Sequence, residues 1–239
     1  SLKGGHRPME DDPQKHLLTR DRQTERGQRQ GFQKLKSMPI ETNLSKELPI
    51  FPLTVNVLPG GYLPLQIFEP RYLDMVKSCM SQETGFCVVL LRCLNETGSS
   101  KLPDHSPIGT YVEIVDFNQL ENGLLGITVQ GRYRVKIIDR RKQEDGLIMG
   151  DSIEQPEEEE SITLEPQYEN IWRILKEISN PPEIKKLELA INFKNSSSVA
   201  YNLASLLPLT PPERQNILEF QSNVDRFDHL NKIVKQLGG

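Results

Sequence analysis

The segment that decides the fold is Thr110–Ile138, which reads TYVEIVDFNQLENGLLGITVQGRYRVKII. Two strand-like runs, Thr110–Leu120 and Leu124–Ile138, flank the dipeptide Asn122-Gly123. Asn-Gly tolerates positive φ at both central positions of a tight turn, so the segment predicts a β-hairpin. Asp145-Gly146 repeats the same turn chemistry a short distance downstream. Several short strands joined by tight turns favour a barrel or a sandwich.

The second strand of this hairpin alternates between apolar and polar side chains. One face is predicted to carry Leu125, Ile127, Val129, Tyr133, Val135 and Ile137. The other face is predicted to carry Thr128, Gln130, Arg132, Arg134 and Lys136, and Arg140, Arg141 and Lys142 extend it. Because strand residues point alternately to opposite faces, these cations form a positive ladder. The ladder is open to two interpretations: a solvated strand face or a surface that faces a ligand.

Two signals upstream add a strand and a helix to this β region. The apolar run Leu48–Leu53 is interrupted by prolines, which favours an edge strand over a central one. Pro70 suits the first turn of a helix, where its missing N–H costs nothing. A helix is then predicted from residues at helical spacing, namely Tyr72, Leu73, Val76 and Met80.

The last third of the chain changes to a helical period after an acidic run, Glu157–Glu160, which predicts a solvated linker. Three apolar stripes follow: Tyr168, Ile171, Trp172, Leu175 and Ile178; Ile184, Leu187, Ala190 and Ile191; Val199, Leu203, Leu206 and Leu207. A capping box at Thr210–Glu213 then predicts one last helix of more than five turns, ending near Leu237.

These patterns divide the chain into three parts. Residues 1–45 are almost entirely polar and are predicted to be a disordered leader, or added sequence upstream of a native start at Met38. Residues 46–156 form the β part and residues 157–239 the helical part. Hydrophobic residues make up 36% and charged residues 26% of the 239, proportions typical of a globular protein.

The sequence carries no motif that would make it an enzyme. It has no G-x-x-x-x-G-K-[ST] phosphate loop, no G-x-S-x-G elbow and no H-E-x-x-H helix. Ser196-Ser197-Ser198 is interpreted as a helix cap rather than a nucleophile. Three cysteines and four histidines are scattered without ligand spacing, so we expect no metal, no cofactor and reduced thiols. No apolar run approaches the ~20 residues that a membrane span requires, and the cytoplasm is the expected compartment.

Two quoted runs resemble a known family. Leu48–Leu53 (LPIFPL), Leu58-Pro59-Gly60 and Leu63–Tyr72 (LPLQIFEPRY) are similar to the opening of the N-terminal, substrate-binding domain of the Lon protease family. The similarity resumes at Ile108-Gly109-Thr110 and at Gly131–Val135, and extends over most of residues 47–239.

The resemblance implies an α+β fold: a PUA-like, mostly antiparallel β-barrel followed by a C-terminal helical bundle. It also implies a non-catalytic module that binds polypeptide, either an unfolded or degron-bearing substrate or a protein partner, and that serves as an adaptor in proteolysis or quality control. The residues that could contact this partner are Glu69, Arg71, Tyr72, Gln130, Arg132 and Arg134. Residues 68–72 are first expected to hold the strand to the helix.

RNA binding is the alternative, because PUA-like barrels occur in RNA-binding proteins and the positive ladder could follow phosphates. The net charge of −4 and the lack of exposed aromatic residues interleaved with the ladder argue against nucleic acid. Salt dependence separates the two, since phosphate binding weakens steeply with salt.

The absence of a phosphate loop generates the first prediction. The purified protein should neither hydrolyse ATP nor cleave casein, because no backbone cradle for phosphates is present. ATP turnover and casein cleavage are measured against a heat-killed control. Activity that co-elutes with the protein through two different columns would contradict the prediction.

Overall fold

The computed structural model describes residues 45–92, 102–157, 166–187 and 189–237. These residues lie within one compact unit, Asn43–Gly239. Residues 1–44 of the predicted leader, Cys93 and the acidic residues 158–160 lie outside the described residues. Among the described helices, none is long and apolar enough to cross a membrane.

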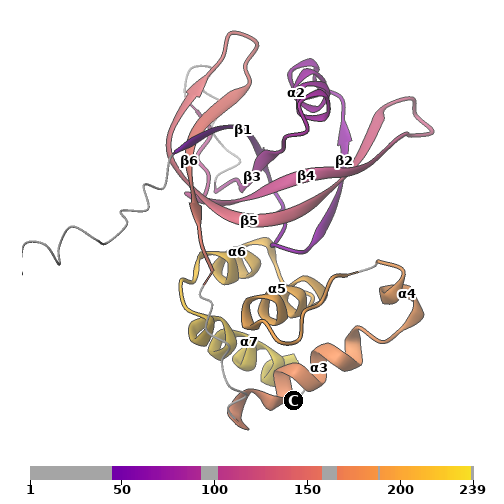
Figure 1. The fold of residues 1–239 in the computed structure, drawn as a ribbon, viewed down its shortest axis with the longest axis vertical. Coiled ribbons are helices and arrows are strands. Elements are labelled where there is room, and N and C mark those ends of the chain that lie inside the picture. Colours follow the sequence, from indigo (N-terminus) through magenta and orange to yellow (C-terminus); the bar gives the residue numbers. More distant parts are fainter. Residues whose placement is uncertain (1–44, 93–101, 158–165, 188, 238–239) are drawn as a thin grey trace, which may run out of the picture. The chain divides into compact units, whose positions relative to one another are not determined.

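The first half of the described chain forms one mixed, mostly antiparallel sheet (Figure 1). Its strands are β1 (Lys46–Leu53), β2 (Tyr62–Ile67), β3 (Phe86–Leu90), β4 (Ile108–Gln119), β5 (Leu125–Lys142) and β6 (Ile148–Gln155). The strand order is β2-β5-β4-β3-β1-β6, and β5 also pairs with β6. The pairings therefore run from β5 through β4, β3, β1 and β6 back to β5. Only β1 and β3 pair in parallel.

The prediction that Leu48–Leu53 is an edge strand is wrong, because β1 pairs with β6 on one side and β3 on the other. The prolines are accommodated because the two pairings overlap only at Ile50. Pro49 lies where β1 pairs with β6 alone, and Pro52 where it pairs with β3 alone. A proline, which has no N–H to donate, is tolerated where one side of the strand has no partner.

Both predicted hairpins are present. β4 and β5 are antiparallel around Gly123, whose φ is +80°, and β5 and β6 are antiparallel around Gly146, whose φ is +88°. Asn122 Oδ1 accepts from the Leu124 N–H at 3.1 Å, and Asp145 Oδ1 from the Leu147 N–H at 2.9 Å. The turn type differs from the predicted one, because among the described non-glycine residues only Glu83 has a positive φ, so Asn122 and Asp145 do not. The Gly123 N–H donates to Leu120 O at 2.8 Å and the Gly146 N–H to Gln143 O at 3.0 Å, as in a type I turn followed by a left-handed glycine.

The predicted strict alternation along β5 is wrong, because one of the two bulges in its pairing with β4 adds a residue to β5. Arg132 is an extra residue between Gly131, which pairs with Val112, and Tyr133, which pairs with Tyr111. An extra residue shifts the side-chain phase by one. The apolar residues before and after Arg132 therefore belong to different cores. Ile127 and Val129 pack beneath α2, whereas Tyr133, Val135 and Ile137 pack with Leu48, Cys87 and Ile148.

Helix α2 (Pro70–Ser81) follows the prediction and covers the first of these cores. Tyr72, Met75, Val76 and Cys79 are its buried residues. They contact Phe51, Phe86 and the β5 residues Ile127 and Val129. In Figure 1, α2 lies between the β1 end of the sheet and the projecting β4–β5 hairpin. The sequence places Pro70 at the start of α2, where no main-chain hydrogen bond is lost.

The second half of the chain is helical. It comprises η2 (Pro166–Tyr168), α3 (Glu169–Ile178), α4 (Pro182–Lys185), α5 (Ser196–Leu206), α6 (Pro211–Glu219) and α7 (Asn223–Leu237). Their core is built on α5, and Leu58 and Ile108 of the β part join it. The mixed sheet and the helical part thus share buried residues.

Three predictions for this half need correction. The stripe of Ile184–Ile191 yields only the short α4. The last helix is two helices, because the chain is extended at Phe220, where ψ is 134°. Asn195, not the serines, caps α5: its side chain accepts from the Ser198 N–H at 2.7 Å. A stripe at helical spacing persists through such breaks, so periodicity alone does not reveal them.

The capping box generates a stability prediction. Thr210 Oγ1 accepts from the Glu213 N–H at 3.4 Å, and Glu213 Oε2 accepts from the Thr210 N–H at 2.8 Å. Thr210→Ala should lower the free energy of unfolding by about 1 kcal/mol, because it removes one acceptor at the start of α6. Urea unfolding measures this, with Thr54→Ala at an exposed bend as control. Equal loss in both variants would argue against the cap.

Candidate functional site

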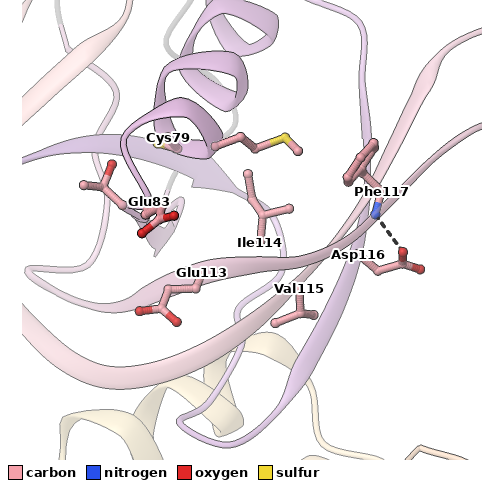
Figure 2. Close-up of a pocket in the computed structure, with 9 residues that line it drawn as sticks. Cys79, Glu83, Glu113, Ile114, Val115, Asp116 and Phe117 are labelled. Carbon is pink, nitrogen blue, oxygen red and sulfur yellow. Dashed lines mark hydrogen bonds between the residues drawn. The ribbon is translucent and has the colours of Figure 1, made fainter.

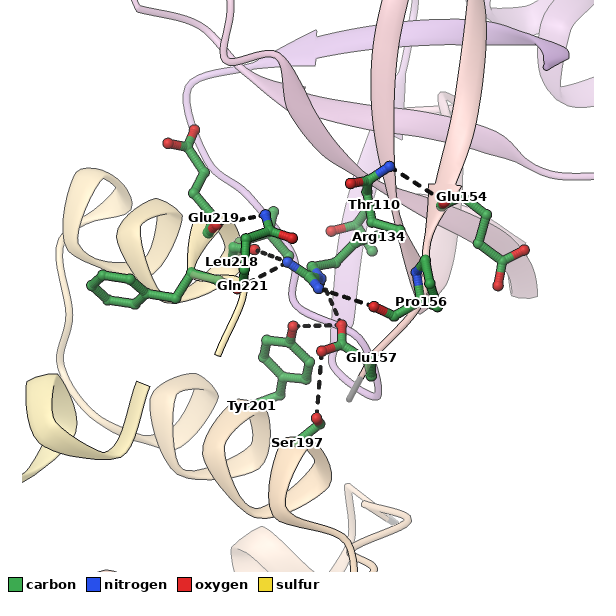
Figure 3. A network of polar contacts seen from close by, with 12 residues as sticks. Thr110, Arg134, Glu154, Pro156, Glu157, Ser197, Tyr201, Leu218, Glu219 and Gln221 are labelled. Atoms are coloured by element: carbon green, nitrogen blue, oxygen red, sulfur yellow. Dashed lines mark hydrogen bonds and ion pairs between the residues drawn. The ribbon is translucent and has the colours of Figure 1, made fainter. Parts of the chain in front are cut away.

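The positive ladder is not a continuous surface, because Arg134 is completely buried. The Arg134 guanidinium lies against the helical part, where Nε meets Glu157 Oε1 at 2.6 Å (Figure 3). Nη1 donates to the main-chain oxygens of Leu218 at 3.1 Å and Phe220 at 2.9 Å, where α6 ends. Arg134 thus connects β5 to α6 and cannot contact a partner directly.

A second buried arginine, Arg226 of α7, binds the other oxygen of the same carboxylate. Its Nη1 lies 2.7 Å from Glu157 Oε2, and its Nη2 donates to Phe220 O at 2.7 Å. Tyr201 of α5 donates its hydroxyl to Glu157 Oε1 at 2.7 Å. Burial raises the pKa of Tyr201, so the hydroxyl keeps the proton that it donates. Glu157 therefore belongs to a buried network rather than to the solvated linker predicted for it.

The other predicted contact residues have structural partners as well. Arg132 Nε binds Glu113 Oε2 at 2.7 Å on the surface, and Gln130 Nε2 donates to the Tyr62 hydroxyl at 3.0 Å. Arg141 pairs with Glu47. Arg134 is buried, and Arg132 and Arg141 are paired with carboxylates, so Lys136 and Lys142 stay exposed without forming one continuous row of cations. The ladder therefore does not support RNA binding.

Glu69, Arg71 and Tyr72 form the corner between β2 and α2. Arg71 binds Glu69 Oε2 at 2.7 Å and donates to Gly146 O at 2.8 Å, so it ties the corner to the β5–β6 turn. Tyr72 is buried against Phe51, with ring centroids 4.2 Å apart. Partner contacts by Glu69 and Arg71 stay a prediction.

A hollow of about 380 Å³ lies between the C-terminal end of α2 and β4 (Figure 2). We call it the α2–β4 pocket, and it is lined by Cys79, Met80, Glu83, Thr84 and residues 113–117. Figure 2 shows Ile114 and Phe117 directed toward α2. Phe117 is 59% exposed and Met80 39% exposed, which is unusual for side chains of this size.

The second bulge in the hairpin places Phe117 in this pocket. Ile114 pairs with Val129 and Phe117 with Ile127, so Val115 is the extra residue. Residues that pair directly share a face, and Ile127 and Val129 both lie beneath α2. Without the bulge, Phe117 would point to the opposite face from Ile114. Strict alternation could not have revealed this, and the only signal in the sequence is an apolar pair, Val115 and Phe117, in an otherwise polar stretch.

The side chains of the pocket are suited to binding rather than to covalent chemistry. Its one thiol, Cys79, is buried, and burial raises its pKa, so it is not an activated thiolate. Three carboxylates, Glu83, Glu113 and Asp116, surround the apolar floor. In the part of the chain that the structure describes, no group of three or more His, Cys, Asp or Glu residues is arranged to hold a metal ion. The arrangement is a pocket of mixed polarity, with an apolar floor and an acidic rim.

Comparisons with known proteins agree with the fold. The family model for the ATP-dependent protease La (LON) substrate-binding domain matches residues 47–236, and the chain belongs to this family. The crystal structure of a Lon N-terminal domain protein from Xanthomonas campestris is similar, with a TM-score of 0.61 and 28% identity over 77% of this chain and 96% of that one.

Two other proteins contain a segment that is similar in sequence to this chain. Lon protease 2 of Herpetosiphon aurantiacus is 26% identical over 207 residues, which cover 82% of this chain and 24% of that protein. Protein cereblon of Danio rerio is 30% identical over 106 residues, which cover 43% of this chain and 24% of that protein. The matched segment thus spans about a quarter of the length of each relative.

The Glu157 network generates the third prediction. Glu157→Gln leaves two buried guanidinium charges without a counter-ion and should lower the free energy of unfolding by about 3 kcal/mol. This is the lower end of the usual cost, because the Glu157 side chain is one quarter exposed and Gln keeps one oxygen acceptor. Urea unfolding of Glu154→Gln, at an exposed carboxylate on β6, is the control. A Glu157→Gln midpoint equal to that of the control would show that the two charges are stabilised in another way.

Proposed function

We propose that this protein is a non-catalytic, Lon-N-like module that binds polypeptide through the α2–β4 pocket. The observation that carries the proposal is the exposure of Phe117 and Met80 around an apolar hollow, in a chain of the LON substrate-binding family. Exposed aromatic and methionine side chains are enriched where proteins bind other proteins. An unfolded or degron-bearing segment is the proposed ligand, and a dedicated protein partner is bound by the same chemistry.

The size of the pocket fits a transient interaction. Burying one large apolar side chain contributes about 1.5–3 kcal/mol, and Phe117 and Met80 already lose part of their exposure to neighbours. Two such contacts give a modest affinity, since ordering an unfolded ligand costs free energy. Weak, reversible binding suits an adaptor that transfers substrates to a protease or to other quality-control proteins.

A continuous series of strand pairings lies behind the pocket. We infer that this closed series is a PUA-like barrel, to which the Glu157 network joins the helical part. A scaffold that is ordered before binding lowers the entropic cost of binding. The cytoplasm stays the predicted compartment, and the buried, unpaired thiols of Cys79 and Cys87 fit a reducing one.

The fourth prediction tests the pocket. Phe117→Ser should weaken binding of a fluorescent, reduced and carboxymethylated unfolded protein about tenfold, equivalent to about 1.4 kcal/mol. Ile138→Ser is the matched control, because Ile138 is also about half exposed but lies at a bulge on β5 away from the pocket. Fluorescence anisotropy gives both dissociation constants.

Two negative results would have different meanings. Equal binding by wild type, Phe117→Ser and Ile138→Ser would show that the polypeptide binds outside the pocket. No binding by the wild type would contradict polypeptide capture itself. A low salt dependence is expected for the apolar part of the contact.

A further inference from the structure

One edge of β4 is open where it passes the α2–β4 pocket. β4 pairs with β5 along its whole length, Ile108–Gln119, but with β3 only from Thr110 to Val112. From Glu113 to Gln119, the side of β4 that faces away from β5 has no strand partner in the described chain. Main-chain N–H and C=O groups that have no strand partner along such an edge can pair with another strand. Within this segment the Phe117 N–H is already held by Asp116 Oδ1 at 2.9 Å. We call this segment the β4 edge.

The β4 edge and the pocket are continuous. Residues 113–117 belong to both, and Ile114 and Phe117 project from the edge toward α2 (Figure 2). A strand laid beside β4 would direct alternate side chains to the α2 side, where Met80, Ile114 and Phe117 form the apolar floor. The volume of about 380 Å³ lies within the range of about 300–1,000 Å³ that ligand pockets occupy.

The rim of the pocket sets the charge of the ligand. Glu113 is neutralised by Arg132, but Glu83 and Asp116 have no cationic partner within the described ranges. Asp116 is held in place because its Oδ1 accepts from the Phe117 N–H at 2.9 Å. Glu83 is exposed in the turn after α2, where its φ is +53°. Two carboxylates beside an apolar floor complement lysine or arginine residues that flank an apolar segment.

We propose that an extended polypeptide with alternating apolar residues and a basic flank binds as an added strand on the β4 edge. Its main chain pairs with Glu113–Gln119, an apolar side chain enters the α2–β4 pocket, and a lysine or arginine lies beside Glu83 and Asp116. Main-chain pairing provides affinity for many sequences, and the pocket and the rim provide selectivity. The inference rests on the proposed polypeptide binding and specifies how it occurs.

The fifth prediction separates strand addition from simple apolar capture. The probe is a fluorescent nonapeptide with alternating valine, threonine and leucine between two terminal lysines. Two derivatives carry N-methyl groups on alternate amides, one set on each edge of the extended peptide. The set that faces β4 should lose at least about tenfold in affinity, because each methyl removes a donor and blocks the approach of the strands. The other set should stay within about twofold of the parent.

The charge preference is tested with the same probe. The double variant Glu83→Gln, Asp116→Asn should bind the lysine-flanked peptide about three- to tenfold more weakly and lose most of its salt dependence. Asn at 116 keeps the oxygen that holds the Phe117 N–H, so the edge geometry is retained. Asp74→Asn, at an exposed carboxylate of α2, is the matched control and should leave the affinity unchanged.

The outcomes distinguish this inference from the function on which it rests. Equal affinity of both methylated sets, or an equal loss in both, would overturn strand addition even if Phe117→Ser still weakens polypeptide binding. An unchanged affinity in the Glu83→Gln, Asp116→Asn variant would overturn the basic flank. If the parent peptide and the unfolded protein both fail to bind the wild type, the proposed function fails as well.

Discussion

The structure depends on one carboxylate shared by two buried guanidinium groups. Glu157 lies where the sheet ends and the helical part begins, and it binds Arg134 of β5 and Arg226 of α7 at 2.6 and 2.7 Å. Removing two cations from water is costly, and their remaining donors must all find acceptors. They find them on main-chain oxygens at the end of α6. The position of the helical part relative to the sheet is therefore set by charge satisfaction as well as by the apolar contacts of Leu58 and Ile108.

A second, smaller set of polar contacts supports the same junction. Asn56 Nδ2 donates to Gln215 Oε1 at 3.0 Å, and Gln215 Nε2 donates to Ile108 O at 2.9 Å. Both side chains are buried, so each bond replaces water that the fold excludes. The chain belongs to a family of substrate-binding domains, and the binding surface proposed on β4 would gain precision from strands that are held in this way.

Much of the fold follows from local chemistry that the sequence displays. The turns at Asn122-Gly123 and Asp145-Gly146, the proline at the start of α2 and the capping box at Thr210 are each decided by a few adjacent residues. The mixed, mostly antiparallel sheet and the helical second half agree with the resemblance to Lon. Features that depend on distant partners could not be predicted. The bulges at Val115 and Arg132 and the central place of β1 arise from pairing between strands.

In the candidate site, too, features that depend on distant residues could not be predicted from the sequence. Arg134 was a reasonable candidate for a partner contact because it alternates with apolar residues, yet its partners, Glu157 and the end of α6, are 23 and more than 80 residues away in sequence. The sequence did not identify Phe117 as a candidate, because strict alternation places it on the face opposite to Ile114. The extra residue Val115 turns it toward α2 instead. A prediction from alternating residues assumes that the strand pairs with its neighbour without a bulge. Functional surfaces on sheets often lie where a bulge interrupts this pairing.

The break between α6 and α7 has a consequence for how this half of the chain can vary. In an uninterrupted helix, the carbonyl oxygens of Leu218 and Phe220 would each be engaged by an amide four residues further on. The two guanidinium groups would then lose the main-chain acceptors that the end of α6 offers and keep only their other partners, Glu157 among them. A mutation that joined α6 to α7 would improve local helix propensity and still harm the molecule. A continuous helix through Phe220 is therefore unfavourable, and the extended backbone at this residue is itself an acceptor site that a comparison of side chains alone would not detect.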